Sequence, residues 1–421
     1  MNTRPTPSGP VAPCTPALKF REIPESDIER ALALAYLAFH EKPEDELRSH
    51  HKDLLRGCAR VGAYDGDELV GMVAAFPFTL SVPGGELPCP GVTFACVAPT
   101  HRRRGALSGL LAELFARCAA EDWPLAALWA SEAVIYGRFG FGDATHGITV
   151  ELDSTRPLAL RIAPDERPLR LVDPADAPAL IAGFYERTRA ARPGRIGRTK
   201  AWWTEEWMNE KDEDDEDMSP PRTVVIGEPL AGYAIYRTKR DESTPGAPGL
   251  VRVDDLEAET PAAAAALWQY LASIDLTGKV RAWGRPLDDP LLLFAADRDQ
   301  VRVTDEFPAL WVRLTDVRAA LLRRSWAAPV DLVLDVHDAH LPDNSGPHRL
   351  TSGPDGTAYE PTHDPADLSV DVRDLAACYL GGTRMTALVH AGLAAEHTPG
   401  AAAALDAALH TELLPHTVDG F

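Results

Sequence analysis

The stretch that decides the fold covers residues 97–107 and reads VAPTHRRRGAL. It lies between an apolar run over residues 91–97, which predicts a β-strand, and a segment over residues 105–121 whose leucines recur at helical spacing. A turn between them leaves the first backbone N–H groups of the helix without partners inside the helix, and the helix dipole favours a negative charge there. Strand, turn and helix together therefore predict a pyrophosphate-binding site.

Side chains in the same stretch strengthen this prediction. Gly105 carries no Cβ, so a ligand is able to approach the backbone closely. Arg102, Arg103 and Arg104 add positive charge to a chain that is otherwise acidic. A basic triplet alone is more often ordinary surface, and it is the neighbouring strand, glycine and helix that favour phosphate binding.

Working outward, the first 150 residues predict a mixed α+β architecture. The expected helices cover residues 28–39, 43–55 and 105–121, and the expected strands cover 60–64, 69–76, 79–82, 91–97 and 124–130. Layers of this kind bury the apolar face of a sheet against amphipathic helices.

A fainter copy of this order follows, which indicates an internal duplication. LAGYAIYR at 230–237 takes the place that LVGMVAAF has at 69–76, and a strand over 250–256 precedes a helix over 260–274. A third α+β region follows, with a strand at 331–336, and the segments 367–372, 374–390 and 401–409 complete it. We predict a disordered tail over 1–16 and domains over 17–153, 154–304 and 305–421.

Composition excludes several classes of protein. The chain has 63 acidic and 42 basic residues among 421, a formal net charge of −21, which disfavours nucleic acid and anionic membranes as partners and favours cationic small molecules. No run of about 18 apolar residues predicts a membrane span. The six cysteines show no CxxC spacing and the histidines no metal-ligand spacing, so we expect reduced thiols, a cytoplasmic location and no metal.

A second motif follows the strand expected at 124–130, where residues 130–142 read ASEAVIYGRFGFG. The first motif resembles the coenzyme A loop of the GCN5-related N-acetyltransferases, R/Q-x-x-G-x-G/A. Arg102 and Gly105 match that pattern, whereas Leu107 departs from its final Gly or Ala. With the second motif, the duplicated unit and the third domain, the chain resembles the Eis (enhanced intracellular survival) N-acetyltransferases.

This resemblance implies two tandem acetyltransferase folds followed by a sterol-carrier-protein-like α+β domain. It implies acetyl-CoA as cosubstrate and acetylation of aminoglycosides, polyamines or lysine, at several positions of one substrate, and hence an antibiotic-resistance activity. It also implies a homo-oligomer, with a hexamer as one expected form.

The same resemblance supplies roles for individual residues. Tyr136 is the expected acid that protonates the leaving thiolate, and the C-terminal carboxylate of Phe421 is the expected base, acting directly or through water. Either residue has a simpler interpretation, a loop tyrosine or a frayed chain end. The expected cofactor-binding residues are Ala95, Cys96, Val97, Arg102, Arg103, Arg104, Gly105, Ala106, Leu107, Ser108, Ser131 and Glu132. Phe94 and Trp129 are expected to line the substrate pocket, although a core position is about as consistent with their type.

The second unit departs from the first at the corresponding loop. Residues 257–261 read EAETP, with no glycine or arginine and with two carboxylates where phosphates would bind. We therefore predict one active and one structural unit. Two alternatives stay open: a lipid-binding or scaffold protein that uses the third domain, and a protein-lysine or dedicated biosynthetic acetyltransferase, with loops 36–48 and 76–92 shaping the choice of substrate.

Overall fold

The computed structural model describes residues 17–212, 215–240 and 248–421, and the tail expected over 1–16 lies outside them. The chain divides into two compact units. The N-terminal unit comprises the described residues up to Phe76 together with Val92–Arg117, and the main unit comprises Pro77–Gly91 together with Cys118–Phe421.

The N-terminal unit is a sheet in the order β1-β2-β3-β6 with helices packed against it. Helix α1 buries Ile28, Ala31, Leu32 and Ala35, the i, i+3, i+4, i+7 spacing of one helical face. The strands are β1 (Lys19–Glu22), β2 (Ala59–Asp65), β3 (Glu68–Phe76) and β6 (Gly91–Val97), and the helices are η1 (Glu25–Asp27), α1 (Ile28–Phe39), α2 (Asp45–Gly57), η2 (Pro99–His101) and α3 (Ala106–Ala120). The predicted strand, loop and helix around residue 100 are thus confirmed.

The main unit begins with short elements that carry part of the site. A hairpin pairs β4 (Thr79–Val82) with β5 (Gly85–Pro88). Three further strands lie in the order β7-β16-β8, which are β7 (Leu125–Trp129), β16 (Leu310–Leu314) and β8 (Gly142–Asp143). Between β7 and β8 the chain forms α4 (Ala133–Tyr136) and η3 (Gly137–Phe139).

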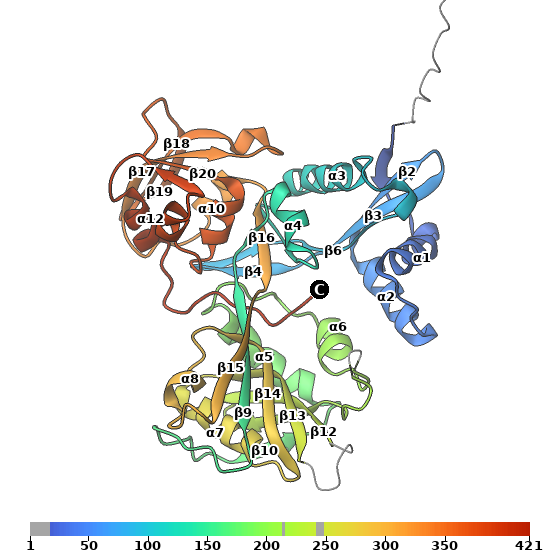
Figure 1. Ribbon diagram of the computed structural model, residues 1–421, viewed down its shortest axis with the longest axis vertical. Coiled ribbons are helices and arrows are strands. Elements are labelled where there is room, and N and C mark those ends of the chain that lie inside the picture. The colour runs from blue at the N-terminus through green and yellow to red at the C-terminus, as the bar shows by residue number, and fades with distance from the viewer. Residues whose placement is uncertain (1–16, 213–214, 241–247) are drawn as a thin grey trace, which may run out of the picture. The chain divides into compact units, whose positions relative to one another are not determined.

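The largest sheet of the main unit has the order β10-β11-β12-β13-β14-β9-β15 and is covered on both faces (Figure 1). Alternate residues divide between two cores: Val224 and Ala234 pack with α7 (Pro261–Ala272), and Val225 and Tyr233 pack with α5 (Ala177–Arg189). The strands are β9 (His146–Asp153), β10 (Leu169–Val172), β11 (Arg222–Ile226), β12 (Gly232–Lys239), β13 (Gly249–Ala258), β14 (Thr277–Pro286) and β15 (Val301–Pro308), and the remaining helices are α6 (Lys200–Trp202), η4 (Trp203–Trp207) and α8 (Leu291–Phe294).

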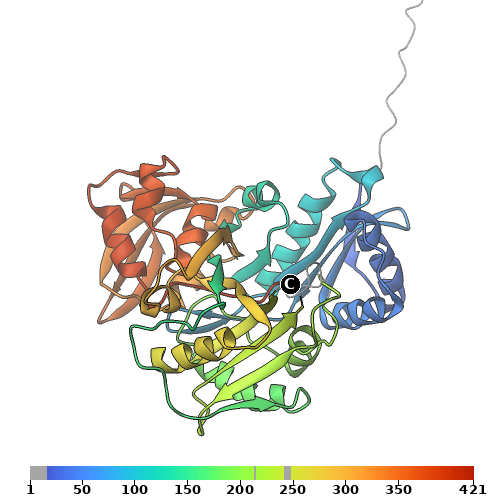
Figure 2. The same cartoon turned by 60° about the horizontal axis from the view of Figure 1, so that its bottom comes forward.

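A third sheet, in the order β19-β18-β17-β20-β21, forms the C-terminal part of the main unit (Figure 2). Its strands are β17 (Val330–His337), β18 (Gly346–Gly353), β19 (Gly356–Pro361), β20 (Leu368–Asp371) and β21 (Ala394–Glu396). The helices are α9 (Val317–Leu322), η5 (Pro342–Asn344), α10 (Val372–Tyr379), α11 (Met385–His390) and α12 (Ala401–Leu409). The chain then runs without regular structure from His410 to Phe421.

Two strands pair with strands that are distant from them in the sequence. Strand β9 follows β8 in the chain, yet it pairs with β14 and β15 in the largest sheet. Strand β16 follows β15, yet it pairs with β7 and β8. The domain boundaries at 153 and 304 stay a prediction, and this exchange of strands crosses both of them.

Candidate active site

The loop between β6 and α3 in the N-terminal unit adopts an unusual backbone conformation. Arg103 and Gly105 have φ angles of +60° and +80°. A Cβ on Gly105 would meet no heavy atom within 4 Å, so the positive φ, rather than a lack of space, requires glycine here. The sequence suggested that residue 105 is glycine so that a ligand can approach the backbone, and the positive φ is a second reason for glycine at this position.

The turn leads directly into the first turn of α3. The amide of Gly109 donates to the carbonyl oxygen of Gly105 at 3.0 Å, the first i→i−4 hydrogen bond of this helix. The amides of Ala106, Leu107 and Ser108 precede that bond, at the positions where a helix offers no acceptor of its own. Three successive donors at the positive end of a helix dipole fit a pyrophosphate.

The three arginines of the loop differ in their surroundings. Arg102 and Arg103 are exposed. Arg104 donates to Asp65 Oδ2 at 3.0 Å, and His101 Nε2 lies 3.2 Å from the same oxygen. The hydrogen bond from Arg104 is the main reason why the pKa of Asp65 lies below its usual value. Arg104 thus ties the loop to the end of β2, which leaves Arg102 and Arg103 as the side chains better placed for a phosphate.

The strand before the loop contributes Phe94, Ala95, Cys96 and Val97. Cys96 is buried, and burial raises the pKa of its thiol to about 12, so it is protonated and unreactive near neutral pH. Phe94 meets the His51 ring edge-on with centroids 5.7 Å apart, and the Tyr36 hydroxyl lies 3.0 Å from His51 Nδ1. Phe94 therefore belongs to a cluster of aromatic side chains in the N-terminal unit.

Tyr136 lies in the main unit at the end of α4, and its side chain is buried. Its ring meets Phe141 edge-on with centroids 6.2 Å apart. Two glycines fix the segment that follows: a Cβ on Gly137 would lie 2.7 Å from the Arg373 guanidinium, and a Cβ on Gly142 would lie 2.0 Å from the Arg373 carbonyl oxygen. Helix α10 thus packs so closely on this segment that only glycine fits.

The other residues expected near Tyr136 divide into two groups. Ser131 and Glu132 are exposed on the segment between β7 and α4. Trp129 is half-buried at the end of β7, and its indole N–H donates to the carbonyl oxygen of Asp419 at 2.6 Å. Trp129 therefore contacts the C-terminal segment, which no local pattern in the sequence indicates.

The last residue is packed rather than frayed. The Phe421 ring meets the Phe78 ring with centroids 5.1 Å apart. A Cβ on Gly91 would lie 2.6 Å from Phe78 and 2.8 Å from Phe421, so both rings occupy the space that this glycine leaves. Phe78 also meets Trp202 edge-on at 5.1 Å. Aromatic contacts of this kind hold the chain end against the main unit.

The residues that hold the rest of the C-terminal segment were not expected from the sequence. Asp419 is 2 % exposed and accepts hydrogen bonds from Arg198 at 2.8 Å and from the indoles of Trp202 and Trp207 at 3.1 Å each. Arg192 donates to the carbonyl oxygen of Leu414 at 2.6 Å. The sequence feature that could have indicated these contacts is the arginine-rich run RPGRIGR at 192–198, whose residues follow neither a helical nor a strand periodicity.

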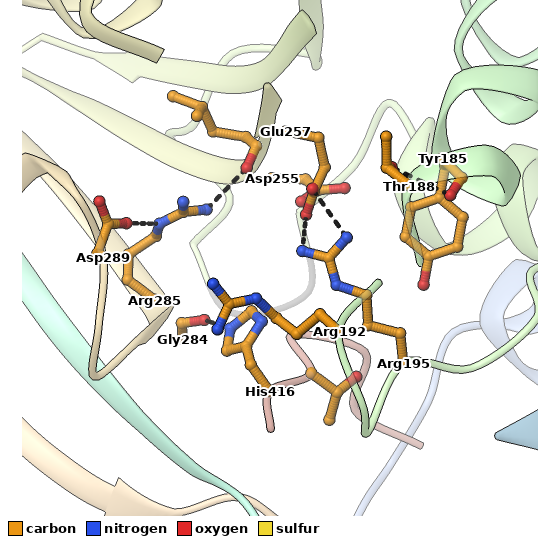
Figure 3. A network of polar contacts seen from close by, with 12 residues as sticks. Tyr185, Thr188, Arg192, Arg195, Asp255, Glu257, Gly284, Arg285, Asp289 and His416 are labelled. Carbon is orange, nitrogen blue, oxygen red and sulfur yellow. Dashed lines mark hydrogen bonds and ion pairs between the residues drawn. The ribbon is translucent and has the colours of Figure 1, made fainter. Parts of the chain in front are cut away.

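The corresponding loop of the second fold lacks the features of a phosphate site. Glu257 forms a two-pronged ion pair with the buried Arg195, one bond being 2.8 Å long (Figure 3). The Thr260 hydroxyl accepts from the amide of Ala263 at 3.2 Å, and Pro261 has no N–H to offer. Arg195 therefore pairs with the Glu257 carboxylate, whereas Glu259 is exposed, and the division into one active and one structural unit stays a prediction.

Two further observations concern only the described part of the chain. None of its helices is long and apolar enough to cross a membrane. It contains no group of three or more His, Cys, Asp or Glu residues arranged to hold a metal ion.

Comparisons with known families match three successive parts of the chain. The family described as "Acetyltransferase (GNAT) domain" matches residues 19–144, and a second family of the same description matches residues 194–318. The family described as "Sterol carrier protein domain" matches residues 317–417. The α+β class with two tandem acetyltransferase folds and a sterol-carrier-protein-like domain is thereby confirmed.

Individual relatives cover most of the chain. An uncharacterized N-acetyltransferase of Streptomyces avermitilis is 40 % identical over 87 % of this chain and 90 % of its own. N-acetyltransferase Eis of Mycobacterium tuberculosis is 36 % identical over 79 % of this chain and 81 % of its own. The crystal structure of Eis1 from Mycobacterium abscessus is 33 % identical, with a TM-score of 0.84 over 96 % of this chain and 100 % of that one.

Proposed function

Because this chain belongs to the Eis family of GCN5-related N-acetyltransferases, we propose that it acetylates cationic small molecules that carry several amines. Transfer of an acetyl group from acetyl-CoA to an amine is the activity of the family, and the class of amine substrate is our inference. Aminoglycosides, polyamines and lysine side chains are the candidates, with acetylation at more than one position.

The observation that carries the cofactor assignment is the β6–α3 turn. It combines the positive φ of Gly105, the first-turn amides of Ala106–Ser108 and the exposed Arg102 and Arg103. We assign these groups to the pyrophosphate of acetyl-CoA and the end of β6 to the remainder of the molecule, and we keep Ser131 and Glu132 as proposed cofactor-binding residues. Acetyl-CoA supplies the thioester whose acetyl group is transferred.

The proposed chemistry removes protons from the nitrogen and supplies one to the sulfur. An alkyl amine with a pKa near ~10 arrives as an ammonium ion and must lose a proton before its nitrogen attacks the thioester carbonyl. We assign that proton to the C-terminal carboxylate of Phe421, directly or through water. The new C–N bond leaves a second proton on the nitrogen, which passes to solvent as the amide forms. The C–S bond then breaks, and the Tyr136 hydroxyl donates its proton to the departing thiolate and is reprotonated from solvent.

Acidic surroundings support the choice of a cationic substrate. A cavity of about 210 Å³ in the main unit borders Val418, Asp419 and Gly420. Its lining includes five carboxylate residues and three cationic ones, the carboxylates being Glu205, Glu206, Asp212, Asp254 and Asp419. Arg237 and Arg252 pair with Asp212 and Asp254, and Arg198 pairs with Asp419, so the attraction of ammonium groups rests mainly on the net charge of −21.

The location and the assembly are proposals of the same kind. Cys58, Cys89, Cys96 and Cys378 are free thiols, which supports the cytoplasm as the compartment. A homo-oligomer, with a hexamer as one form, rests on the family alone.

The first test measures thiol release from acetyl-CoA with aminoglycosides, polyamines and lysine peptides, using protein with its native C-terminus. Release with several multi-amine compounds, and products that carry two or more acetyl groups by mass spectrometry, is the expected result. Release with one compound or with lysine peptides alone would replace the broad substrate class by a dedicated one.

A C-terminal extension tests the base. Adding residues after Phe421 converts its carboxylate into an amide, so we expect turnover to fall by about 100-fold or more while acetyl-CoA binding persists. The same residues added before Met1 serve as the control. Full turnover by an extended chain, with the extension verified by mass spectrometry, would contradict the assignment of Phe421.

A further inference from the structure

The C-terminal segment ends in two anchors that are separated by one residue. Asp419 is buried, Gly420 is exposed, and the Phe421 ring packs against Phe78. A Cβ on Gly420 would meet no heavy atom within 4 Å. The position of the terminal carboxylate therefore depends on the groups that hold Asp419 and the Phe421 ring.

Asp419 is held by an unusual concentration of donors for a single carboxylate. Oδ1 accepts from Arg198 Nε at 2.8 Å and from the Trp202 and Trp207 indoles at 3.1 Å each. The Tyr185 hydroxyl, which donates to the Ile196 carbonyl oxygen at 2.9 Å, lies 3.4 Å from Oδ2. Both charged side chains are buried: the side chain of Arg198 is 0 % exposed and that of Asp419 is 1 % exposed. A buried carboxylate that lacks water requires such partners.

Arg198 is itself fixed by groups from other segments. Its Nη1 donates to Asp255 Oδ2 at 2.8 Å, and its guanidinium lies 4.0 Å from the ring centroids of Tyr185 and of Trp207. Burial alone would lower the pKa of Arg198, but the charges of Asp419, Tyr185 and Asp255 raise it well above its usual value. The arginine is thus permanently charged and offers Asp419 a fixed partner.

The residues that precede Asp419 are held by the same part of the main unit. Arg192 donates to the Leu414 carbonyl oxygen, and the Leu414 amide donates to Asp288 at 2.9 Å. The His416 amide donates to the Pro193 carbonyl oxygen at 2.9 Å, and its ring contacts the Gly284 carbonyl oxygen (Figure 3). The second acetyltransferase fold, whose own loop lacks a phosphate site, thus holds the chain end.

From this arrangement we infer that Asp419 is a positioning residue, whose buried ion pair with Arg198 sets the place of the Phe421 carboxylate. The inference rests on the proposed role of that carboxylate as base. Asp419 has no proton-transfer role of its own, because its oxygens are directed at Arg198 and the two tryptophans. A base that is displaced by about 1 Å is expected to lose up to about 100-fold in rate.

The variant that tests this is Asp419→Asn, which keeps the size of the side chain and removes its charge. Asp289→Asn is the matched control, because Asp289 is also 1 % exposed and also pairs with a buried arginine, Arg285, at 2.8 Å. The readouts are kcat, the dissociation constant for acetyl-CoA, and the rate at which carboxypeptidase A releases free phenylalanine from the folded protein.

We expect Asp419→Asn to lower kcat by about tenfold or more, to leave acetyl-CoA binding within about twofold of the original, and to speed the release of Phe421. Asp289→Asn is expected to change neither kcat nor the release of Phe421, even where it lowers the melting temperature equally. Equal effects of the two variants on kcat and release would overturn the inference.

A milder variant keeps the test valid if Asp419→Asn does not fold. Trp207→Phe removes one donor to Asp419 and retains an aromatic ring beside Arg198, so it should change kcat and phenylalanine release in the same direction by about two- to threefold. Unchanged values for both would contradict the inference.

Deletion of Phe421 separates this inference from the proposed function. If the shortened chain is inactive while Asp419→Asn retains full kcat, the base assignment stands and the positioning role is wrong. If the shortened chain retains full kcat, the base assignment itself is wrong, and the positioning role is overturned with it.

Discussion

At the scale of single residues, the contrast between Tyr136 and Cys96 shows how the environment selects chemistry. Both side chains are buried. Cys96 lies in the strand that leads to the β6–α3 turn, but the high pKa of its thiol excludes a nucleophilic role near neutral pH. Tyr136 ends a short helix in a segment shaped by glycines, which suits a side chain that must be held in one orientation.

Replacing Tyr136 by Phe removes only the hydroxyl, so we predict a fall in kcat of about 100-fold. The acetyl-CoA dissociation constant should stay within about twofold, because the ring and its contact with Phe141 remain. Steady-state kinetics and isothermal titration calorimetry measure the two quantities. An equal loss of binding and turnover would indicate a structural role instead.

The conformation of Gly105 leads to a second residue-scale prediction. An alanine at φ = +80° is strained by about 1–2 kcal/mol, although its Cβ would meet no neighbour. Gly105→Ala should therefore distort the turn and raise the KM for acetyl-CoA by about three- to tenfold. Gly57→Ala is the control, since a Cβ there also meets nothing and its φ is not positive. Equal KM values for the two variants would contradict the prediction.

At the scale of elements, the loop between β6 and α3 depends on a tie to the β2–β3 hairpin. Asp65 accepts from Arg104 and contacts His101, and the pKa of Asp65 is lowered by these partners. A lowered carboxyl pKa means that the tie is complete above the ordinary pKa of Asp and is lost as the pH falls through the lower folded value. The loop should therefore keep its conformation across the neutral and mildly acidic range.

Asp65→Asn should release Arg104 and raise the KM for acetyl-CoA by about three- to fivefold, in keeping with the modest strength of ion pairs that solvent reaches. Its control is Asp331→Asn in β17, because Asp331 also accepts from one arginine, Arg349 Nε at 2.8 Å, in a more exposed pair far from the loop in sequence. Kinetics with varied acetyl-CoA measures both. A KM that rises equally in both variants would show that the effect is not specific to the loop.

At the scale of the whole molecule, the two acetyltransferase folds differ in the turn that joins a central strand to the following helix. The turn after β6 presents helix amides beside exposed arginines, whereas the turn after β13 is capped by Thr260 and begins its helix with Pro261. Arg195 and Arg198, which lie between α5 and α6, hold Glu257 and Asp419 instead of a phosphate. One fold is thus suited to the cosubstrate and the other to the chain end.

This divergence predicts that one acetyl-CoA molecule binds per chain. Isothermal titration calorimetry gives the stoichiometry directly, and a value of two would contradict the division of roles. The double variant Arg102→Ala with Arg103→Ala should weaken this binding by about tenfold or more, because two charge-assisted contacts are lost. Binding that survives the double variant unchanged would place the cosubstrate elsewhere in the chain.

Features whose cause is local could be predicted from the sequence alone. The sequence predicted a helix over residues 28–39, with the bounds that α1 shows, and the strand, turn and helix around residue 100. It also indicated the internal duplication and the family. The site residues stay predictions, although the structure shows the backbone conformation that a phosphate-binding turn requires.

Only the tertiary structure decided the features that join distant residues. Strand β9 enters the largest sheet, β16 pairs with β7, and Arg198 meets Asp419 across 221 positions of the chain. Nothing in the local pattern of residues 146–153 or 310–314 distinguishes one sheet from another, because a strand is selected by its partners as well as by its own side chains. The position of the chain end likewise depends on the ion pair between Arg198 and Asp419, and neither residue stands out in the sequence.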